Sequence, residues 1–227
     1  KTFLDYLVNS QGLCNKAREH CGAAPRQICH RDNMITHKLD RELARKKPAL
    51  TEEQIKQLLD GIGEGIDLAY RFTSKSLVPL QRDKALFSVV YGLGLRSAEA
   101  CNLDLDDFYP NPDLPKLGSF GFARITGKGS RGTGPKFRTS AIKFPWVAET
   151  LRWYVEKIRP QLLKHADPNE KALFLTERGT RLTRSSLSNR FQEAVELSGL
   201  DGLGFTPHCL RHSYISHVQD AGLSLEA

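Results

Sequence analysis

A basic segment interrupted by proline divides this chain into two unequal parts. Residues 45–50 read RKKPAL, and Thr51-Glu-Glu-Gln54 follows directly. A threonine followed three residues later by glutamine is the pattern of a capping box, which predicts a helix that begins just after Thr51. The roughly fifty residues before this break are too few for a comfortable core of their own. We therefore expect residues 1–47 to end one domain and residues 48–227 to form a second, larger one.

The composition excludes several classes of protein. The chain has 227 residues, of which 40% are apolar and 26% charged, enough for a folded core. No apolar run reaches the length of about eighteen residues that a membrane-spanning helix needs, and the start, KTFLDYLVNS, lacks the apolar centre of a secretion signal. Five cysteines at irregular spacing do not suit a secreted disulfide framework. We therefore expect a cytoplasmic protein.

The positive charge is concentrated in two blocks. The whole chain carries a net charge of +7. Residues 1–50 hold ten basic and five acidic side chains, and residues 111–145 hold seven and one, whereas the other two stretches are acidic or neutral. Concentrated positive charge is the electrostatic footprint of a nucleic-acid partner, because each neutralised phosphate releases a counterion. Charge alone fits a solvated basic surface equally well.

Apolar periodicity predicts a mainly helical domain with a small antiparallel sheet. Two expected strands flank the glycine-rich, basic segment 127–136, which suits a hairpin. The fold class is therefore α+β, mainly helical. Helices are expected after Thr51 and at 83–91, 97–102, 145–158, 185–197 and 207–221, and strands at 120–126, 137–144 and 172–176.

The segment 206–212, TPHCLRH, carries the most informative group of polar side chains. Thr206 and Pro207 suit the start of a helix. His208, Arg211 and His212 would then share one face of its first turns. A phosphate bound there would meet an imidazole, a guanidinium and the unpaired amides of the helix start. The alternative is a surface helix whose histidines are merely capped, and for this segment alone it is the commoner case.

Two further cationic candidates are Arg96, in GLGLRSAE, and Lys128, in TGKG. Arg96 precedes a short expected helix, and Glu99 can orient its guanidinium through a bidentate contact. Lys128 stands at the tip of the expected hairpin between two glycines, which allow a close approach to a partner's backbone. The alternatives are a surface ion pair of little energetic value and an exposed loop lysine.

In this order, GLRSAEA, GKG and HCLRH closely resemble the catalytic domain of the tyrosine recombinases, the phage integrase family. The resemblance covers roughly residues 48–227, and HxLRH at a helix start is its most specific element. It implies that residues 1–47 end a helical core-binding domain that contacts the other face of the DNA. It implies that Arg96 is the first catalytic arginine, Glu99 the acid that supports it and Lys128 the lysine of the hairpin. It further implies that His208 is the box histidine, Arg211 the second catalytic arginine and His212 the histidine that follows.

The resemblance implies strand exchange in duplex DNA through a 3′-phosphotyrosyl intermediate. Each phosphodiester is replaced by a link to tyrosine and later re-formed, so bond energy is kept and neither a cofactor nor a metal is expected. The two arginines would hold the non-bridging oxygens. Lys128 would protonate the leaving 5′ oxygen, and His208 would donate to the phosphate or assist the nucleophile. The expected partner is an inverted-repeat DNA site bound by two protomers, with four in the strand-exchange complex.

The sequence departs from the family pattern at its end. The family continues with a histidine or tryptophan and then the nucleophilic tyrosine, whereas this sequence ends at Ala227. Tyr214 comes closest, but it follows Arg211 by three residues, and we expect it to pack in the core; we expect His217 to be structural. We therefore expect a recombinase truncated on both sides, which binds DNA but contains no nucleophile to cut it. The six tyrosines are Tyr6, Tyr70, Tyr91, Tyr109, Tyr154 and Tyr214.

Two rival interpretations stay open. A non-catalytic DNA-binding protein could keep the fold and the arginines, and a type IB topoisomerase shares the chemistry but relaxes supercoils as a monomer. The complete HxLRH favours a recombinase, since topoisomerases more often carry lysine at the position of His208. In each case further basic residues would contact backbone phosphates and set the salt dependence of binding more than its specificity. The predicted contacts are Lys46, Lys47, Arg131, Lys136 and Arg138.

Two other patterns are weighed and set aside. The loop GKGSRGTGP lacks the Gly-Lys-Ser/Thr ending before a helix, so we reject nucleotide binding. A cluster of cysteines and histidines in the first fifty residues lacks a close cysteine pair, so structural thiols are favoured over a zinc site. That cluster consists of Cys14, Cys21, Cys29, His30 and His37.

Overall fold

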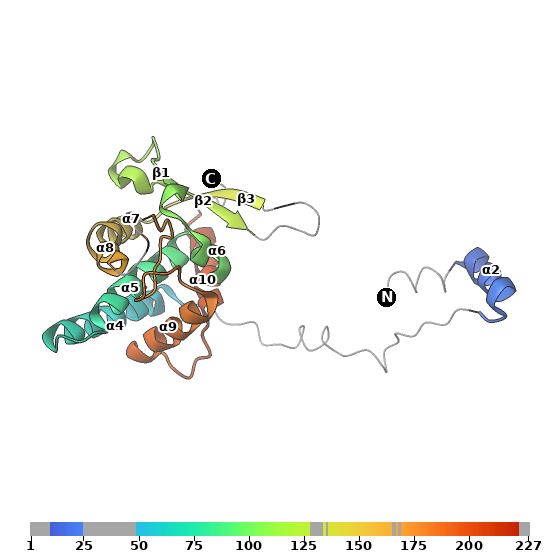
Figure 1. Ribbon diagram of the computed structural model, residues 1–227, viewed down its shortest axis with the longest axis horizontal. Coiled ribbons are helices and arrows are strands. Elements are labelled where there is room, and N and C mark those ends of the chain that lie inside the picture. The colour runs from blue at the N-terminus through green and yellow to red at the C-terminus, as the bar shows by residue number, and fades with distance from the viewer. Residues whose placement is uncertain are drawn as a thin grey trace. The chain divides into compact units, whose positions relative to one another are not determined.

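The computed structural model describes residues 10–24, 49–127, 134, 136–164, 167 and 169–222. The chain divides into two compact units, Lys1–Lys46 and Lys47–Ala227. In the first unit the described residues form the helix α2 (Gln11–Cys21), which has no buried residue. The larger unit consists mainly of helices, with a small sheet at one edge (Figure 1). That residues 1–47 end a core-binding domain stays a prediction.

The structure bears on two points of the sequence analysis, the candidate zinc cluster and the search for membrane-spanning helices. Cys14 and Cys21 of the candidate zinc cluster lie on α2, while its other three members lie outside the described residues. Within the described ranges, no three metal-ligating side chains come together. Among the helices that are described, none combines the length and apolar character that crossing a membrane requires.

The first helix of the larger unit, α4 (Glu52–Arg71), begins where the sequence predicts it. The Gln54 amide donates to Thr51 Oγ1 at 3.2 Å, and the Thr51 amide donates to Gln54 Oε1 at 2.9 Å. Both hydrogen bonds of the capping box are therefore present, and they satisfy two amides that have no partner within the helix. The predicted capping box is confirmed.

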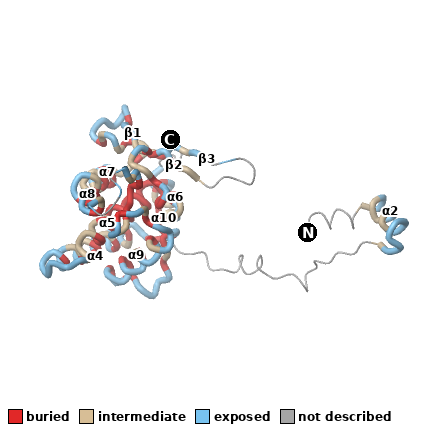
Figure 2. Tube along the Cα trace, in the orientation of Figure 1, coloured by how far each residue is buried: buried red, intermediate tan, exposed pale blue. Residues whose placement is uncertain are grey.

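The central helix is α5 (Leu77–Gly92), which packs against α4, α7 (Pro145–Trp153) and α10 (Pro207–Asp220). All of its residues from 85 to 92 are buried, and Figure 2 shows it within the buried centre of the unit. A helix covered on every side has no polar face, which explains the continuous apolar run in its sequence. It begins six residues before the expected start, and Pro79 is compatible with that start because it lies in the first turn, where no amide donor is required.

The sheet has three antiparallel strands in the order β1-β2-β3. β2 (Phe122–Gly127) and β3 (Lys136–Ala141) form the predicted hairpin, with Ile125 opposite Arg138. The expected strand at 120–126 starts too early because Phe120 ends a 3₁₀ helix, η2 (Pro115–Phe120). β1 (Phe108–Tyr109) was not predicted, since two residues are too few to show an alternating pattern.

The predicted amphipathic helix after Pro145 contains a change of winding. α7 leads into a π-helical turn, η3 (Tyr154–Ile158), and then into α8 (Arg159–Leu163). Pro160 has no amide hydrogen to donate to the preceding turn, which accounts for the wider winding at that point. One face of the helical segment nevertheless stays against the core, with Val147, Leu151, Tyr154 and Ile158 buried and Val155 half-buried.

The predicted strand at 172–176 is wrong. The segment is buried, but it forms only two isolated bridges, from Asp104 to Ala172 and from Leu175 to Arg181. Three of its carbonyls accept hydrogen bonds from side chains, whereas the Phe174 carbonyl accepts the Leu182 backbone amide at 3.0 Å. The donors are Arg159 to Ala172 at 3.0 and 2.8 Å, the Tyr154 hydroxyl to Leu173 at 3.0 Å and Arg82 to Leu175 at 3.2 Å.

The remaining helices carry or support the predicted motifs. α6 (Ser97–Asn102) and α10 agree with expectation within a residue, and α9 (Arg184–Leu197) begins one residue earlier than predicted. Both α6 and α10 pack against α5, and α6 also packs against α9. The motifs GLRSAEA and HCLRH, more than a hundred residues apart in sequence, therefore lie at the starts of two helices that both pack on the same central helix.

Two glycines of α4 give a matched test of this packing. A Cβ at Gly61 would lie 2.6 Å from Ser198 Cα, whereas one at Gly63 would lie 3.5 Å from the flexible end of Lys84. We expect Gly61→Ala to lower the free energy of unfolding by about 1–3 kcal/mol through overpacking. Gly63→Ala should raise it by about 0.5–1 kcal/mol through helix propensity. Urea unfolding measures both, and effects of equal sign would contradict the packing described.

Candidate active site

The short helix α6 holds Arg96 and Glu99 together. Arg96 is its N-cap residue, and the Arg96 amide donates to Glu99 Oε2 at 3.0 Å. The Arg96 guanidinium donates through Nη1 to Glu99 Oε1 at 2.7 Å. The expected contact forms, but the carboxylate bridges an amide and a guanidinium instead of receiving two bonds from the guanidinium. The Arg96 side chain stays 57% exposed, which leaves it accessible to an anion.

Two more arginines reach the same carboxylate. Arg138, on β3, donates through Nη2 to Glu99 Oε2 at 3.0 Å. Arg211, on α10, has its Nη1 3.6 Å from that oxygen. The Glu99 side chain is only 3% exposed. One buried carboxylate thus gathers guanidinium groups from three separate elements, and we call Arg96, Glu99, Arg138 and Arg211 the arginine cluster.

Arg138 is the member of the cluster that sequence reasoning placed elsewhere. The sequence suggested a contact to backbone phosphates for it, whereas the structure places its guanidinium on Glu99, 39 residues away in sequence. Its Nε is buried and has no hydrogen-bond partner among the described residues. In the sequence, only the predicted hairpin could have indicated the contact between Arg138 and Glu99. The register that sets Ile125 opposite Arg138 decides which side chain of β3 faces α6.

A glycine at the end of α5 allows Arg211 to approach. Arg211 Nη1 donates to the Gly94 carbonyl at 2.5 Å. Gly94 has φ of 58°, and a Cβ there would lie 2.4 Å from Cδ1 of Tyr214. Both the left-handed backbone and the close ring require glycine at this position. The GLGLR segment therefore holds Arg96 at one end and anchors Arg211 through its backbone.

The positive charges of the cluster outnumber the negative ones, which favours the binding of an anion. Burial opposes ionisation of Glu99, but hydrogen bonds from the Arg96 amide, Arg96 and Arg138 outweigh it and lower the pKa of Glu99. Burial and the neighbouring Arg96 lower the pKa of Arg211. Three guanidinium groups around one carboxylate leave two positive charges without a partner inside the cluster. A phosphate is the natural ligand for such a group, because guanidinium donors match its oxygens.

The two histidines of HCLRH lie beside the cluster on α10. His208 and His212 are both exposed, and their rings meet edge to face with centroids 4.6 Å apart. Between them, Cys209 is fully buried, and its Sγ accepts the Thr206 amide at 3.4 Å. The helix start is thus fixed from inside by Cys209, while both imidazoles face outward as the predicted spacing requires.

Several predicted residues lie elsewhere or are not described. Lys136 is exposed at the start of β3, where the hairpin leaves the sheet. His217 is half-buried, and its Nδ1 lies 2.9 Å from the Tyr91 hydroxyl, which agrees with a structural role. Four predicted residues fall outside the described part of the chain: Lys46, Lys47, Lys128 and Arg131.

Tyr214 packs in the core, as predicted. It is only 6% exposed, its ring lies against Gly94, and its hydroxyl shares a hydrogen bond with the Ser140 side chain. Burial raises the pKa of Tyr214. A nucleophilic phenol needs the opposite, because attack on phosphorus proceeds more readily from the ionised oxygen.

The buried carboxylate predicts how stability depends on pH. Because the pKa of Glu99 is lowered below 4.5, its ionised form stabilises the fold above that pH, and the stabilisation is lost as pH falls through the folded value. At neutral pH we expect Glu99→Gln to lower the free energy of unfolding by about 2 kcal/mol. The difference from wild type should shrink below about pH 4.5.

Urea unfolding at several pH values provides the measurement. Glu149→Gln, at an exposed position of α7, is the matched control and should leave the stability curve in place. A difference between wild type and Glu99→Gln that stayed constant down to pH 3 would show that the ionised carboxylate does not hold the cluster.

Comparison with known proteins places these features in a family. A sequence model of the phage integrase family matches residues 48–227. A tyrosine recombinase XerC of Roseiflexus sp. (strain RS-1) is 34% identical over 227 residues, which are 100% of this chain and 59% of that protein. A tyrosine recombinase XerD of Corynebacterium glutamicum is 36% identical over 141 residues, 62% of this chain and 40% of that protein. The chain spans 59% and 40% of the lengths of these two relatives.

Solved structures share the fold. The XerH site-specific recombinase bound to difH substrate has a TM-score of 0.56 and 23% identity, over 78% of this chain and 44% of that one. The Tn1549 transposon integrase in complex with circular intermediate DNA has a TM-score of 0.61 and 17% identity, over 98% and 66%. These likenesses concern the fold, whereas the family model covers most of the sequence. From its sequence match, its fold and its motifs, the chain belongs to the phage integrase family of tyrosine recombinases.

Proposed function

We propose that this chain is the DNA-binding and phosphate-activating part of a site-specific recombinase, which cleaves and rejoins DNA strands through a 3′-phosphotyrosyl intermediate. The observation that carries the proposal is the arginine cluster. Arg96 and Arg211 reach one buried carboxylate from two different helices, with contacts of 2.7 and 3.6 Å. A shared carboxylate fixes the relative position of two guanidinium groups, which is what holding two oxygens of one phosphate requires.

The charge of the cluster suits the transition state better than the ground state. A phosphodiester carries one negative charge, and its pentacoordinate transition state carries two. The two positive charges that Glu99 leaves unbalanced match the latter. Donors that are already in place cost no reorganisation when the charge develops, so they stabilise the transition state selectively. In this proposal the arginines do the work that metal ions do in other phosphoryl transfers.

The other predicted residues have separate roles around this phosphate. His208, exposed in the first turn of α10, would donate to a phosphate oxygen or assist the nucleophile. Lys128, at the tip of the hairpin in the sequence, would protonate the leaving 5′ oxygen as general acid. Its glycine neighbours would let the tip reach the DNA backbone. Since each step exchanges one phosphoester for another, the reaction needs no external energy source.

The proposal also covers the source of the nucleophile and the assembly of protomers on DNA. Tyr214 is buried at the cluster with a raised pKa, so the nucleophile would be a tyrosine outside the described residues. The printed titles of similar structures describe recombinases with DNA: XerH is bound to difH substrate, and the Tn1549 integrase to circular intermediate DNA. By analogy, the proposed partner is an inverted-repeat duplex bound by two protomers, with four in strand exchange.

The first functional prediction concerns DNA binding. Fluorescence anisotropy with a random duplex should show an affinity that falls steeply with salt, because binding releases counterions. Lys136→Ala should reduce the slope of log affinity against log salt by about one. Lys56→Ala, an exposed residue of α4 in a stretch with Glu52, Glu53 and Asp60, is the control and should leave the slope unchanged. Equal slopes for all three proteins would remove Lys136 from the interface.

The second functional prediction concerns chemistry. A duplex selected from a random library for binding to the chain would be incubated with hydrogen peroxide as a substitute nucleophile. Wild type should cleave it at a defined phosphodiester, and Arg211→Ala should cleave at least about 100-fold more slowly. Duplex affinity should stay nearly unchanged, because many other phosphate contacts carry it.

The outcomes separate the proposal from its rivals. Arg71→Ala, at the exposed end of α4, is the matched arginine control and should cleave like wild type. Unchanged cleavage by Arg211→Ala would remove Arg211 from the site. Tight, selective binding without any cleavage by wild type would instead favour the non-catalytic DNA-binding protein.

A further inference from the structure

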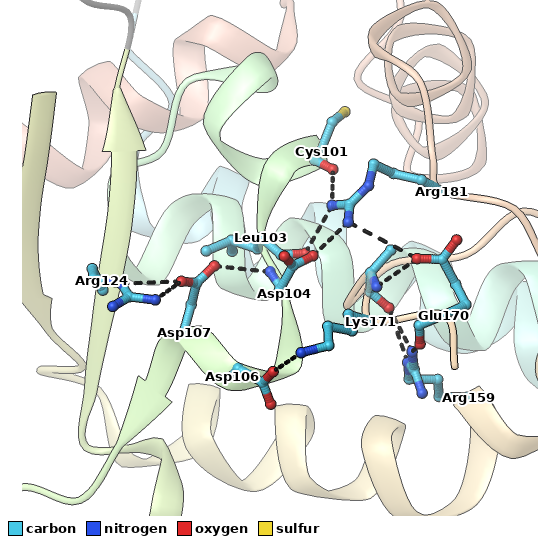
Figure 3. A network of polar contacts seen from close by, with 11 residues as sticks. Cys101, Leu103, Asp104, Asp106, Asp107, Arg124, Arg159, Glu170, Lys171 and Arg181 are labelled. Carbon is cyan, nitrogen blue, oxygen red and sulfur yellow. Dashed lines mark hydrogen bonds and ion pairs between the residues drawn. The ribbon is translucent and has the colours of Figure 1, made fainter. Parts of the chain in front are cut away.

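A second polar network lies at the other end of α6 from the arginine cluster. Its centre is the turn that follows the helix, which contains Asp104 and the 3₁₀ helix η1 (Leu105–Asp107) (Figure 3). Arg181 donates through Nη2 to Asp104 Oδ1 at 2.5 Å. The Asp104 amide donates to Asp107 Oδ2 at 2.9 Å. This acidic turn, residues 104–107, is therefore held both by its own side chains and by an arginine from a distant segment.

Arg181 also binds the end of α6 directly. Its Nη1 donates to the carbonyls of Cys101 at 3.1 Å and Leu103 at 3.3 Å. These carbonyls belong to the last turn of the helix and its C-cap, where acceptors have no partner inside the helix and a positive charge suits the dipole. A planar guanidinium can serve carbonyls and a carboxylate at once because its donors are fixed in a fork. As Figure 3 shows, Arg181 thus ties α6 to the acidic turn.

The acidic turn is connected in turn to the hairpin. Arg124, on β2, lies with its Nη2 3.2 Å from Asp107 Oδ1. Arg124 pairs with Thr139 on β3, the residue next to Arg138. The same turn therefore contacts both the helix that carries Glu99 and the strand pair that carries Arg138. A displacement of α6 relative to the turn would change the Glu99–Arg138 separation of 3.0 Å.

We propose that Arg181 is a positioning residue, which holds α6 against the acidic turn and so keeps Glu99 in register with Arg138 and Arg211. The importance of that register for phosphate binding rests on the function proposed above. The placement itself does not, and it can be tested without DNA. Within the cluster, the contact from Arg96 to Glu99 is local to α6 and would survive a shift of the helix, whereas the contacts from β3 and α10 would not.

A surface ion pair alone would not carry this role. The Arg181 and Asp104 side chains are 36% and 35% exposed, and such pairs contribute little by themselves. What distinguishes Arg181 is that the same guanidinium also takes two backbone carbonyls of α6 and its C-cap. Lys171 provides the contrast within the same network, because its Nζ contacts Asp106 Oδ2 at 2.9 Å with both side chains about two-thirds exposed, and none of its side-chain contacts reaches α6.

The test follows the titration of Glu99 by carboxyl-carbon NMR in the complete 227-residue chain. In Arg181→Gln the midpoint of Glu99 should rise toward its ordinary value of 4.5, because the contact from Arg138 is weakened. Lys171→Gln, which breaks the neighbouring ion pair, should leave the midpoint at the wild-type value. The single variant Arg138→Gln should also raise the Glu99 midpoint. Adding Arg138→Gln to Arg181→Gln should raise it little further, because the two changes remove the same contact.

A role in general stability would give a different pattern. It would lower the resistance to urea without moving the Glu99 midpoint, so an unchanged midpoint in folded Arg181→Gln would overturn the proposal. Equal shifts in Arg181→Gln and Lys171→Gln would also overturn it. If Arg181→Gln does not fold, Asp104→Asn removes the carboxylate partner and keeps both carbonyl contacts; it should give a smaller rise, and no rise would count against the proposal. A failure of DNA binding or cleavage would leave these readouts unaffected.

Discussion

The buried carboxylate of Glu99 is the interaction on which the rest of the site depends. A carboxylate that is 3% exposed is costly to ionise unless opposite charges surround it. Here Arg96, Arg138 and Arg211 supply those charges from α6, β3 and α10, so the carboxylate favours a fold in which three elements meet. The guanidinium groups repel one another, and Glu99 is what allows them to stay close. The same balance leaves an excess of positive charge for a phosphate.

The scaffold explains why these three elements can be held so closely. The central helix α5 is buried from residue 85 to residue 92, and it ends at the glycine-rich segment that leads into Arg96. Gly94 in that segment accepts Arg211 through its carbonyl and fits under the ring of Tyr214. The segment that carries Arg96 and anchors Arg211 is therefore continuous with a buried part of the core. At the C-terminal end of α6, Arg181 connects the helix to the acidic turn, and Arg124 of the hairpin contacts the same turn.

Several helices and one contact of the site could be predicted from local patterns in the sequence. The capping box at Thr51 and the starts of α6 and α10 are set by contacts within a few residues, so each could be predicted. The apolar run of α5 is visible within one segment, although it reflects packing on every side of the helix. The pairing of Arg96 with Glu99 is also local, at a spacing of three residues. The contact between Glu99 and Arg138 depends on how a hairpin packs against a helix 39 residues away, which no local pattern encodes.

The incorrectly predicted strand at 172–176 is a second case in which long-range contacts could not be predicted from a local pattern. Its apolar, β-prone residues gave the pattern of a buried strand, and the segment is indeed buried. Three of its carbonyls, however, accept hydrogen bonds from Arg82, Tyr154 and Arg159, which approach from other elements. Secondary structure that is replaced by long-range side-chain bonds cannot be recognised from the segment alone. The roles given to Lys46, Lys47, Lys128 and Arg131 stay predictions, because these residues lie outside the described part of the chain.

The most direct test of this account is a crystal structure of the chain bound to a duplex that it selects from a random library. The account predicts that one backbone phosphate accepts hydrogen bonds from both Arg96 and Arg211, with Glu99 still in contact with both guanidinium groups. A complex in which the duplex lies against another face, or in which the two arginines contact different phosphates, would contradict the claim that the arginine cluster is a single phosphate site.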